Sequence, residues 1–338
     1  YAGQIGGLGG KNTNLLAKQT DLAIAVGTKL ADFTTGSWAN FENESFKLVS
    51  INVSRFDANK HLALAVVGDA KVSLDELSLA LGDWKAGEEW NKKSQVELKA
   101  WNEYVDKESA PSNQEVPSYV QVIGAIYKNS DPSDIAVTAA GGLVGEVIQV
   151  WRPRELNTHE TEWGFSCMSY EISGALGIKM ANPDKEVISF VGDGSYLLNN
   201  TDIYSSVITN NKLIIIVCDN GGFAVINRLQ LFKGGNEYNN LLKSSNTPGL
   251  VDIDFAKHAE SMGAKSEHVS SISDLEEAFK RAKKSKVTYV ISIKTHAYQW
   301  LEGSAFWDSP TLEVPTTKEN KEALRLYKEG KSKQRQGV

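Results

Sequence analysis

Hydrophobic positions fall into short, mostly apolar runs that alternate with longer amphipathic stretches. In the first part of the chain, such runs cover residues 22–27, 46–53 and 62–67, and helical spacing follows over 72–81. Short apolar runs separated by helical stretches are typical of a parallel α/β sheet. Three strands are few for such a sheet, so this region predicts part of a Rossmann-like domain.

The same alternation resumes at about residue 116 and continues through a larger region. It predicts a doubly wound parallel sheet, an α/β fold whose ligands bind at the carboxyl ends of the strands. The expected strands are 135–138, 187–192, 213–219 and 287–294, and the expected helices are 119–128, 142–151, 169–180, 201–209, 252–262 and 273–283.

Residues 84–115 differ from both regions because they are rich in Lys and Glu and carry several tryptophans. We expect a linker helix here, which divides the chain into a partial domain at 1–83, the linker at 84–115 and a second domain at 116–338. The charged tail from Thr317 predicts a final helix on a solvated or interface surface.

Composition excludes several classes of protein. The 338 residues are 41% hydrophobic and 23% charged, which is typical of a folded globular chain and not of a disordered one. A net charge of −6 gives no indication of nucleic-acid binding, and no apolar run reaches the roughly 18 residues of a membrane span. Two cysteines do not make a disulfide framework, so we expect a cytoplasmic protein in which Cys218 is a small buried hydrophobe.

Several familiar motifs are absent from the sequence. The glycine-rich opening is neither a P-loop, because Asn12 follows Gly10-Lys11, nor a dinucleotide fingerprint, because no strand precedes it. We expect it to be a flexible loop or a ragged end. The five histidines lack metal-ligand spacing, and no Gly-x-Ser-x-Gly sequence supports a serine hydrolase.

The strongest motif is Gly192-Asp193-Gly194-Ser195, which directly follows a predicted strand. Asn220 and Gly222 come directly after the next strand, so Asp193 and Asn220 should converge at one edge of the sheet. A carboxylate, an amide oxygen and a backbone carbonyl are ligands that suit Mg²⁺ bridging a diphosphate. The sequence therefore predicts a magnesium–diphosphate site.

These residues resemble the thiamine-diphosphate-dependent enzymes, whose signature is Gly-Asp-Gly followed by an Asn on the adjacent strand. The resemblance implies thiamine diphosphate and Mg²⁺ as cofactors, with Asp193, Asn220 and the Gly222 carbonyl as metal ligands. The family often has Asn-Asn where this chain has Asp219-Asn220. The other residues implied to contact the cofactor are Gly141, Gly142, Cys167, Met168, Gly192, Gly194, Ser195, Phe223 and Ala224.

A second block, residues 164–177, resembles the family segment in which a large apolar side chain supports the bent cofactor. Met168 matches that side chain. Glu162 and His159 lie just before it and are candidates for substrate or water contacts, or for a surface-loop role. Glu171 is interpreted as structural. Leu143 stands where family members often carry a polar residue.

Segments 32–38, 164–168, 192–196 and 304–308 resemble members of the family that open the ring of a trihydroxycyclohexane-1,2-dione in inositol catabolism. The implied activity is hydrolytic C–C cleavage that yields 5-deoxyglucuronate. Two alternatives stay open: a carboligase or decarboxylase of the acetolactate-synthase type, and a cofactor-binding fragment or subunit without activity of its own. Residues 223–250 depart from the pattern, which bears on the choice of substrate.

The resemblance also implies a homodimer or homotetramer with active sites between subunits, a small cyclic dione as substrate, and no nucleic-acid or membrane partner. In the family, a glutamate from a domain ahead of the central domain activates the cofactor. The chain begins at Tyr1 and its first methionine is Met168, so we expect it to be part of a longer protein. We assign the activating glutamate to no residue of this chain.

Overall fold

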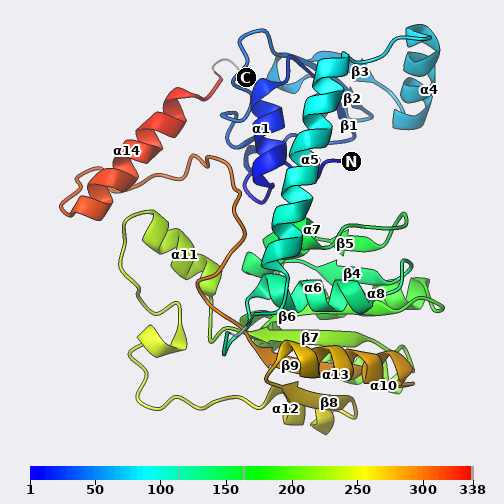
Figure 1. The fold of residues 1–338 in the computed structure, drawn as a ribbon, viewed down its shortest axis with the longest axis vertical. Coiled ribbons are helices and arrows are strands. Elements are labelled where there is room, and N and C mark those ends of the chain that lie inside the picture. Colours follow the sequence, from blue (N-terminus) through cyan, green and yellow to red (C-terminus); the bar gives the residue numbers. More distant parts are fainter. Residues whose placement is uncertain (113, 163, 336–338) are drawn as a thin grey trace. The chain divides into compact units, whose positions relative to one another are not determined.

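A computed structural model describes residues 1–112, 114–162 and 164–335 (Figure 1). Its chain forms two compact units. The first comprises Tyr1–Glu103 together with Glu302–Val338, and the second comprises Tyr104–Leu301. The boundaries expected at residues 83 and 115 concern family domains, and they stay a prediction.

The second unit is built on a parallel sheet, which confirms the predicted α/β class. Within the described residues the sheet has six strands in the order β5-β4-β6-β7-β9-β8, and every pairing is parallel. The strands are β4 (Ile135–Thr138), β5 (His159–Thr161), β6 (Val187–Gly192), β7 (Ile214–Asp219), β8 (Lys265–Val269) and β9 (Tyr289–Lys294).

The central strands were predicted because both of their faces are buried. On one face, Ile215 of β7 shares a core cluster with Ile172 and Phe255 from the covering helices. On the other face, Ile216 is fully buried, where α6 packs with α7 and α13. The helices are α6 (Tyr119–Asn129), α7 (Gly141–Val150), α8 (Tyr170–Ala181), α9 (Asp193–Leu198), α10 (Asp202–Ile208), α11 (Ala224–Phe232), α12 (Phe255–Ser261) and α13 (Ile272–Lys284).

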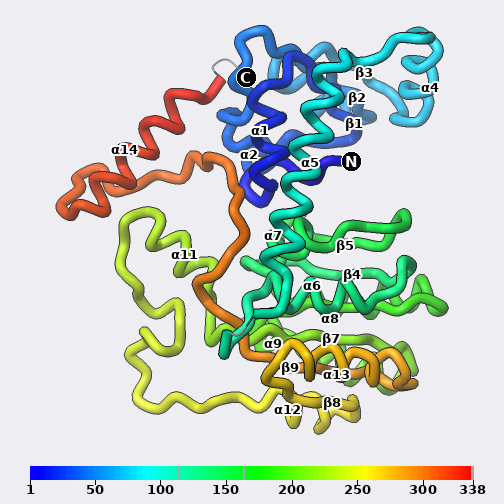
Figure 2. Tube along the Cα trace, in the orientation of Figure 1, coloured from blue at the N-terminus to red at the C-terminus, as the bar shows by residue number. Residues whose placement is uncertain are grey.

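Between α11 and α12 the chain follows a long irregular path, drawn in yellow in Figure 2. Its regular structure is a 3₁₀ turn, η2 (Leu242–Ser244), and a bridge between Gly222 and Leu241. This path contains most of the segment that departs from the family pattern.

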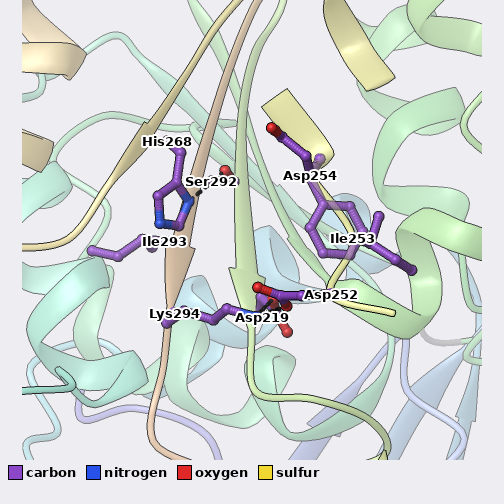
Figure 3. A pocket seen from close by; sticks show the side chains of 9 residues that line it. Asp219, Asp252, Ile253, Asp254, His268, Ser292, Ile293 and Lys294 are labelled. Carbon is purple, nitrogen blue, oxygen red and sulfur yellow. Dashed lines mark hydrogen bonds and ion pairs between the residues drawn. The ribbon is translucent and has the colours of Figure 1, made fainter. Parts of the chain in front are cut away.

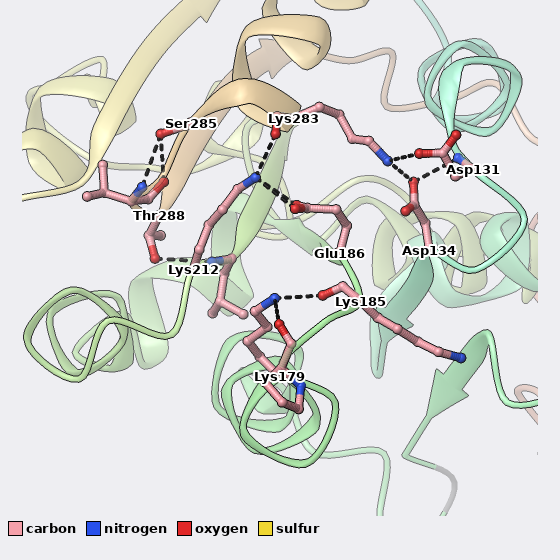
Figure 4. Close-up of polar contacts among 12 residues, drawn as sticks. Asp131, Asp134, Lys179, Lys185, Glu186, Lys212, Lys283, Ser285 and Thr288 are labelled. Carbon is pink, nitrogen blue, oxygen red and sulfur yellow. Dashed lines mark hydrogen bonds and ion pairs between the residues drawn. The ribbon is translucent and has the colours of Figure 1, made fainter.

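Charged side chains meet at the amino-terminal edge of this sheet (Figure 4). Lys212 lies 2.8 Å from the carboxylate of Glu186, just ahead of β7 and β6. Lys283 lies 2.7 Å from Asp131 and 2.6 Å from Asp134, which precede β4. The buried charges at this edge are therefore paired with each other.

In the first unit, three parallel strands form a sheet in the order β1-β2-β3, as predicted for this region. The long α5 begins in this unit and ends in the second. The elements are α1 (Lys11–Gln19), β1 (Leu22–Val26), α2 (Asp32–Thr35), β2 (Lys47–Asn52), α3 (Arg55–Ala58), η1 (Lys60–Leu62), β3 (Leu64–Val67), α4 (Ala70–Leu81), α5 (Glu88–Glu108) and α14 (Lys318–Ser332).

The opening segment is irregular up to Gly10, as expected for a loop, but hydrogen bonds hold its turns in place. The segment runs into α1, and its turns wrap around the buried side chain of Asn14. The Asn14 Oδ1 accepts hydrogen bonds from the Gly6 N–H and from Asn40 Nδ2, each 2.7 Å long. A buried amide that satisfies the turn's backbone groups orders a sequence that by composition alone is typical of a loop.

The tail from Thr317 forms α14 as expected, with the Thr317 hydroxyl accepting the hydrogen bond that caps its start. Among the described residues, none of the helices combines the length and apolar character needed to cross a bilayer.

Candidate functional site

The candidate site lies at the carboxyl ends of β4, β6 and β7, which are neighbours in the sheet. Gly192 is in register with Cys218, so Asp193 and Asp219 both lie where their strands end. The loop after β4 leads into Gly141 and Gly142 at the start of α7. The topology thus brings the three predicted segments to one edge.

Asp193 is the first residue of α9, and only 5% of it is exposed. Burial, together with the nearby Asp219 carboxylate, raises the pKa of Asp193 to about 7. Hydrogen bonds from the backbone N–H groups of Gly194 and Gly222 act in the opposite direction but do not offset this. A buried carboxylate beside another carboxylate favours a proton or a cation as its partner.

Asn220 supplies the second predicted metal ligand, and a hydrogen bond holds the nitrogen end of its side-chain amide. Its Nδ2 donates to the hydroxyl of Tyr119. Its Oδ1 is buried and has no hydrogen-bond partner within the part of the chain that the structure describes. Leaving a buried acceptor without a partner costs about 1–3 kcal/mol, so this oxygen suits a ligand that fills the position.

Gly222 shows why this turn requires glycine. Its φ is +143°, and a Cβ added there would lie 2.5 Å from the carbonyl oxygen of Asn240. Hydrogen bonds from the Phe223 N–H to the Asn240 carbonyl and from the Leu242 N–H to the Gly221 carbonyl hold the two segments together, at 2.7 and 2.8 Å. The backbone around the third predicted ligand is therefore fixed.

Gly142 and Gly194 are two further motif glycines at which a side chain would not fit, and at Gly142 an added Cβ would lie 2.1 Å from the Trp300 ring. A Cβ at Gly194 would lie 2.6 Å from the ring of Phe223. The side chain of Phe223 is exposed, whereas Ala224 and Ser195 are buried. The segments after β6 and β7 thus pack against each other directly.

The loop before α8 presents Met168 and Cys167 at the surface of this unit. Met168 is 37% exposed, and Cys167 is an exposed free thiol. The Ser169 hydroxyl donates to the Ser195 carbonyl at 2.8 Å, which ties this loop to α9. Both predicted contact residues are thereby accessible to a ligand.

Glu162 holds this same loop. Its carboxylate accepts hydrogen bonds from the N–H groups of Phe165 and Cys167, both 2.8 Å long. These bonds lower the pKa of Glu162, which favours its charged form. The contacts match the surface-loop role; a substrate or water contact stays a prediction.

His159 lies on the edge strand β5, and its ring contacts the Thr161 hydroxyl at 3.1 Å. Burial lowers the pKa of His159 to about 4, so the ring is neutral at pH 7. Its place in the strand precedes the carboxyl edge, and its proposed substrate role stays a prediction.

Two family models match the chain. The C-terminal thiamine pyrophosphate (thiamine diphosphate) binding domain of thiamine pyrophosphate enzymes matches residues 139–293, and their central domain matches residues 1–77. The chain belongs to the thiamine pyrophosphate enzyme family. The candidate site falls within the matched cofactor-binding domain.

Curated relatives carry the name 3D-(3,5/4)-trihydroxycyclohexane-1,2-dione hydrolase. The protein from Clostridium tetani is 36% identical, with 90% of this chain and 52% of the relative covered. The protein from Geobacillus thermodenitrificans is also 36% identical, with 97% and 55% covered. The chain spans about half the length of the curated relatives it matches.

Two buried polar residues near the site, Tyr119 and Glu146, were missed by the sequence analysis, and Glu171 was assigned only a structural role. Tyr119 reaches Asn220 from α6, far away in sequence. Glu171 accepts a hydrogen bond from the Ala140 N–H at 3.3 Å, and burial raises its pKa. Burial raises the pKa of Glu146 on α7 to about 7. A lone carboxyl in an apolar helix was the signal that could have identified Glu146.

A cavity of about 320 Å³ lies next to the site and shares Asp219 with it (Figure 3). The Lys294 ammonium lies 2.6 Å from both Asp219 and Asp252. On the other wall, His268 contacts the Ser292 hydroxyl at 3.1 Å. Lys294 thus pairs with one carboxylate oxygen of Asp219, and the other oxygen accepts a hydrogen bond from the Gly221 N–H at 3.0 Å.

In the described ranges, no group of three or more His, Cys, Asp or Glu side chains is arranged to hold a metal. A cation at the Asp193 position would therefore rely on amide and backbone oxygens as well. The orphaned Oδ1 of Asn220 and the closely packed Gly222 backbone fit that requirement.

Proposed function

We propose that this chain is part of a thiamine-diphosphate- and Mg²⁺-dependent enzyme that opens the ring of trihydroxycyclohexane-1,2-dione by hydrolytic C–C cleavage to 5-deoxyglucuronate. The single observation that carries the cofactor part is the buried pair of Asp193 and the Asn220 Oδ1, which lacks a hydrogen-bond partner among the described residues. The similarity to dione hydrolases over most of the chain supports the choice of substrate.

In this proposal, Asp193, Asn220 and the Gly222 carbonyl would hold Mg²⁺, which would neutralise the charge of the diphosphate. Thiamine diphosphate, when bound, supplies the electron sink for cleaving the C–C bond. The role of the chain is to orient it: Met168 would support the bent cofactor, while the glycines after β4 and β6 allow close approach of the backbone.

We also propose that the complete enzyme is a cytoplasmic homodimer or homotetramer with its sites between subunits. Two free cysteines support a reducing compartment. Glu162 and His159 stay low-ranking candidates for substrate contacts, because their described contacts serve the local loop and strand.

Cofactor binding tests the proposal most directly. Calorimetric titration of this chain with thiamine diphosphate should show binding that requires Mg²⁺. Asp193→Ala should abolish the Mg²⁺-dependent part, whereas unchanged binding would contradict the metal assignment.

Product analysis tests the reaction. The full-length protein should convert the cyclic dione and leave pyruvate unchanged. Turnover of pyruvate without turnover of the dione would instead establish the carboligase or decarboxylase alternative. Turnover of either compound by this chain alone would exclude an inactive cofactor-binding fragment.

A further inference from the structure

Tyr119 faces the candidate metal site from α6, although it belongs to none of the motifs. It is 3% exposed, and its ring packs edge-on against Trp300, with ring centroids 5.8 Å apart. The helix start is fixed by a capping box in which Ser118 and Gln121 exchange hydrogen bonds. The hydroxyl is thus held at a defined place.

The amide of Asn220 has two ends, and only its oxygen can bind a cation. The Tyr119 hydroxyl accepts the hydrogen bond from Nδ2, and this leaves Oδ1 as the buried end without a partner in the described part of the chain. In the opposite orientation, the NH₂ group would occupy the ligand position. Resting on the function proposed above, we propose that Tyr119 is a positioning residue that turns the Asn220 oxygen toward Mg²⁺.

Tyr119→Phe removes the hydroxyl and keeps the ring. Titration with Mg²⁺ at saturating thiamine diphosphate, followed by calorimetry, should show about tenfold weaker Mg²⁺ binding, the usual size of an effect from a residue behind a metal ligand. Tyr127→Phe is a matched control on the same helix, since its hydroxyl donates to the Arg152 carbonyl at 3.1 Å. It should bind Mg²⁺ like the unsubstituted protein.

A second background separates orientation from packing. In Asn220→Asp both ends of the side chain are oxygens, so its orientation no longer matters for the metal. Adding Tyr119→Phe to this variant should therefore weaken Mg²⁺ binding much less than it does in the Asn220 protein. An equal loss in both backgrounds would show that Tyr119 acts by packing and would overturn the inference. If Asn220→Asp binds no Mg²⁺, the comparison of Tyr119→Phe with the Tyr127→Phe control decides whether Tyr119 affects Mg²⁺ binding.

The outcomes distinguish this inference from the proposed function. If the unsubstituted chain shows no Mg²⁺-dependent cofactor binding, the proposed function fails. If it binds and Asp193→Ala does not, while Tyr119→Phe binds normally, only the role of Tyr119 fails. Should Tyr119→Phe not fold, a nuclear Overhauser contact between the Asn220 side-chain amide and the Tyr119 ring decides in the unsubstituted protein, and its absence overturns the inference.

Discussion

The two edges of the six-stranded sheet differ in how their buried charged groups are paired. At the amino edge, lysines face carboxylates, as in the pair Lys212–Glu186 (Figure 4). At the carboxyl edge, Lys294 pairs with Asp219, but Asp193 has that carboxylate as its neighbour, and the Asn220 Oδ1 has no partner among the described residues. Polar groups are thus paired at the edge that only needs structure, whereas Asp193 and Asn220 are left open at the edge where a ligand is expected.

The largest expected effect is on ligand binding at the carboxyl edge. Asp193→Asn removes the buried charge while keeping its size, and Mg²⁺-dependent binding of thiamine diphosphate should weaken by at least about 100-fold, as for loss of a charged metal ligand. Calorimetry measures the affinity.

The same substitution should stabilise the ligand-free chain, because a carboxylate buried beside Asp219 is replaced by a neutral amide. Chemical denaturation at pH 8 measures this. A ligand-free Asp193→Asn protein that is less stable than the unsubstituted one would contradict the view that the buried charge of Asp193 destabilises the ligand-free chain.

The matching change at the amino edge should lower the stability of the chain and leave cofactor binding unchanged. Glu186→Gln leaves Lys212, whose side chain is 9% exposed, without its carboxylate. The free energy of unfolding should fall by about 1–3 kcal/mol, because a largely buried charge loses its partner. Cofactor binding should stay unchanged. An equal loss of binding in both variants would show that the two edges do not differ in function.

Within the carboxyl edge, sequence predicts some residues and misses others. Asp193 and Asn220 were found because each directly follows an apolar strand, and strand ends in a parallel sheet share one edge. Tyr119 was missed because its partner is 101 positions away and the hydrogen bond leaves no local pattern. Local motifs reveal ligands, whereas the residues that orient them depend on tertiary packing.

The fold shows the same limit. The strands β4, β6, β7 and β9 are continuous apolar runs because both faces are buried. The edge strands β5 and β8 read His-Glu-Thr and Lys-Ser-Glu-His-Val, and their half-exposed residues give no apolar run to detect. Order in the opening segment depends on Asn14 and Asn40, whose contact cannot be read from composition.

A pH dependence should follow from Asp193. Its pKa is about 7 in the folded chain against an ordinary value of 3.8, so the folded form holds an additional proton between these limits. Its contribution to stability therefore falls as pH rises from about 4 to about 7, by at most about 1.4 kcal/mol per pH unit. Subtracting the stability–pH profile of Asp193→Asn isolates this slope. A flat difference would contradict the assigned environment.

The smallest effect concerns α8, which begins beside the site and leads away from it. Gly177 has open space where a Cβ would lie, so Gly177→Ala should stabilise the chain by about 0.5–1 kcal/mol through helix propensity. Gly174 is the matched control on the same helix, since a Cβ there would lie 2.5 Å from the Tyr170 ring. Gly174→Ala should destabilise the chain, because the ring of Tyr170, the first residue of α8, must move to make room for the Cβ. Thermal unfolding of both variants measures the contrast, and a gain in both would show that the packing around Tyr170 is looser than the structure indicates.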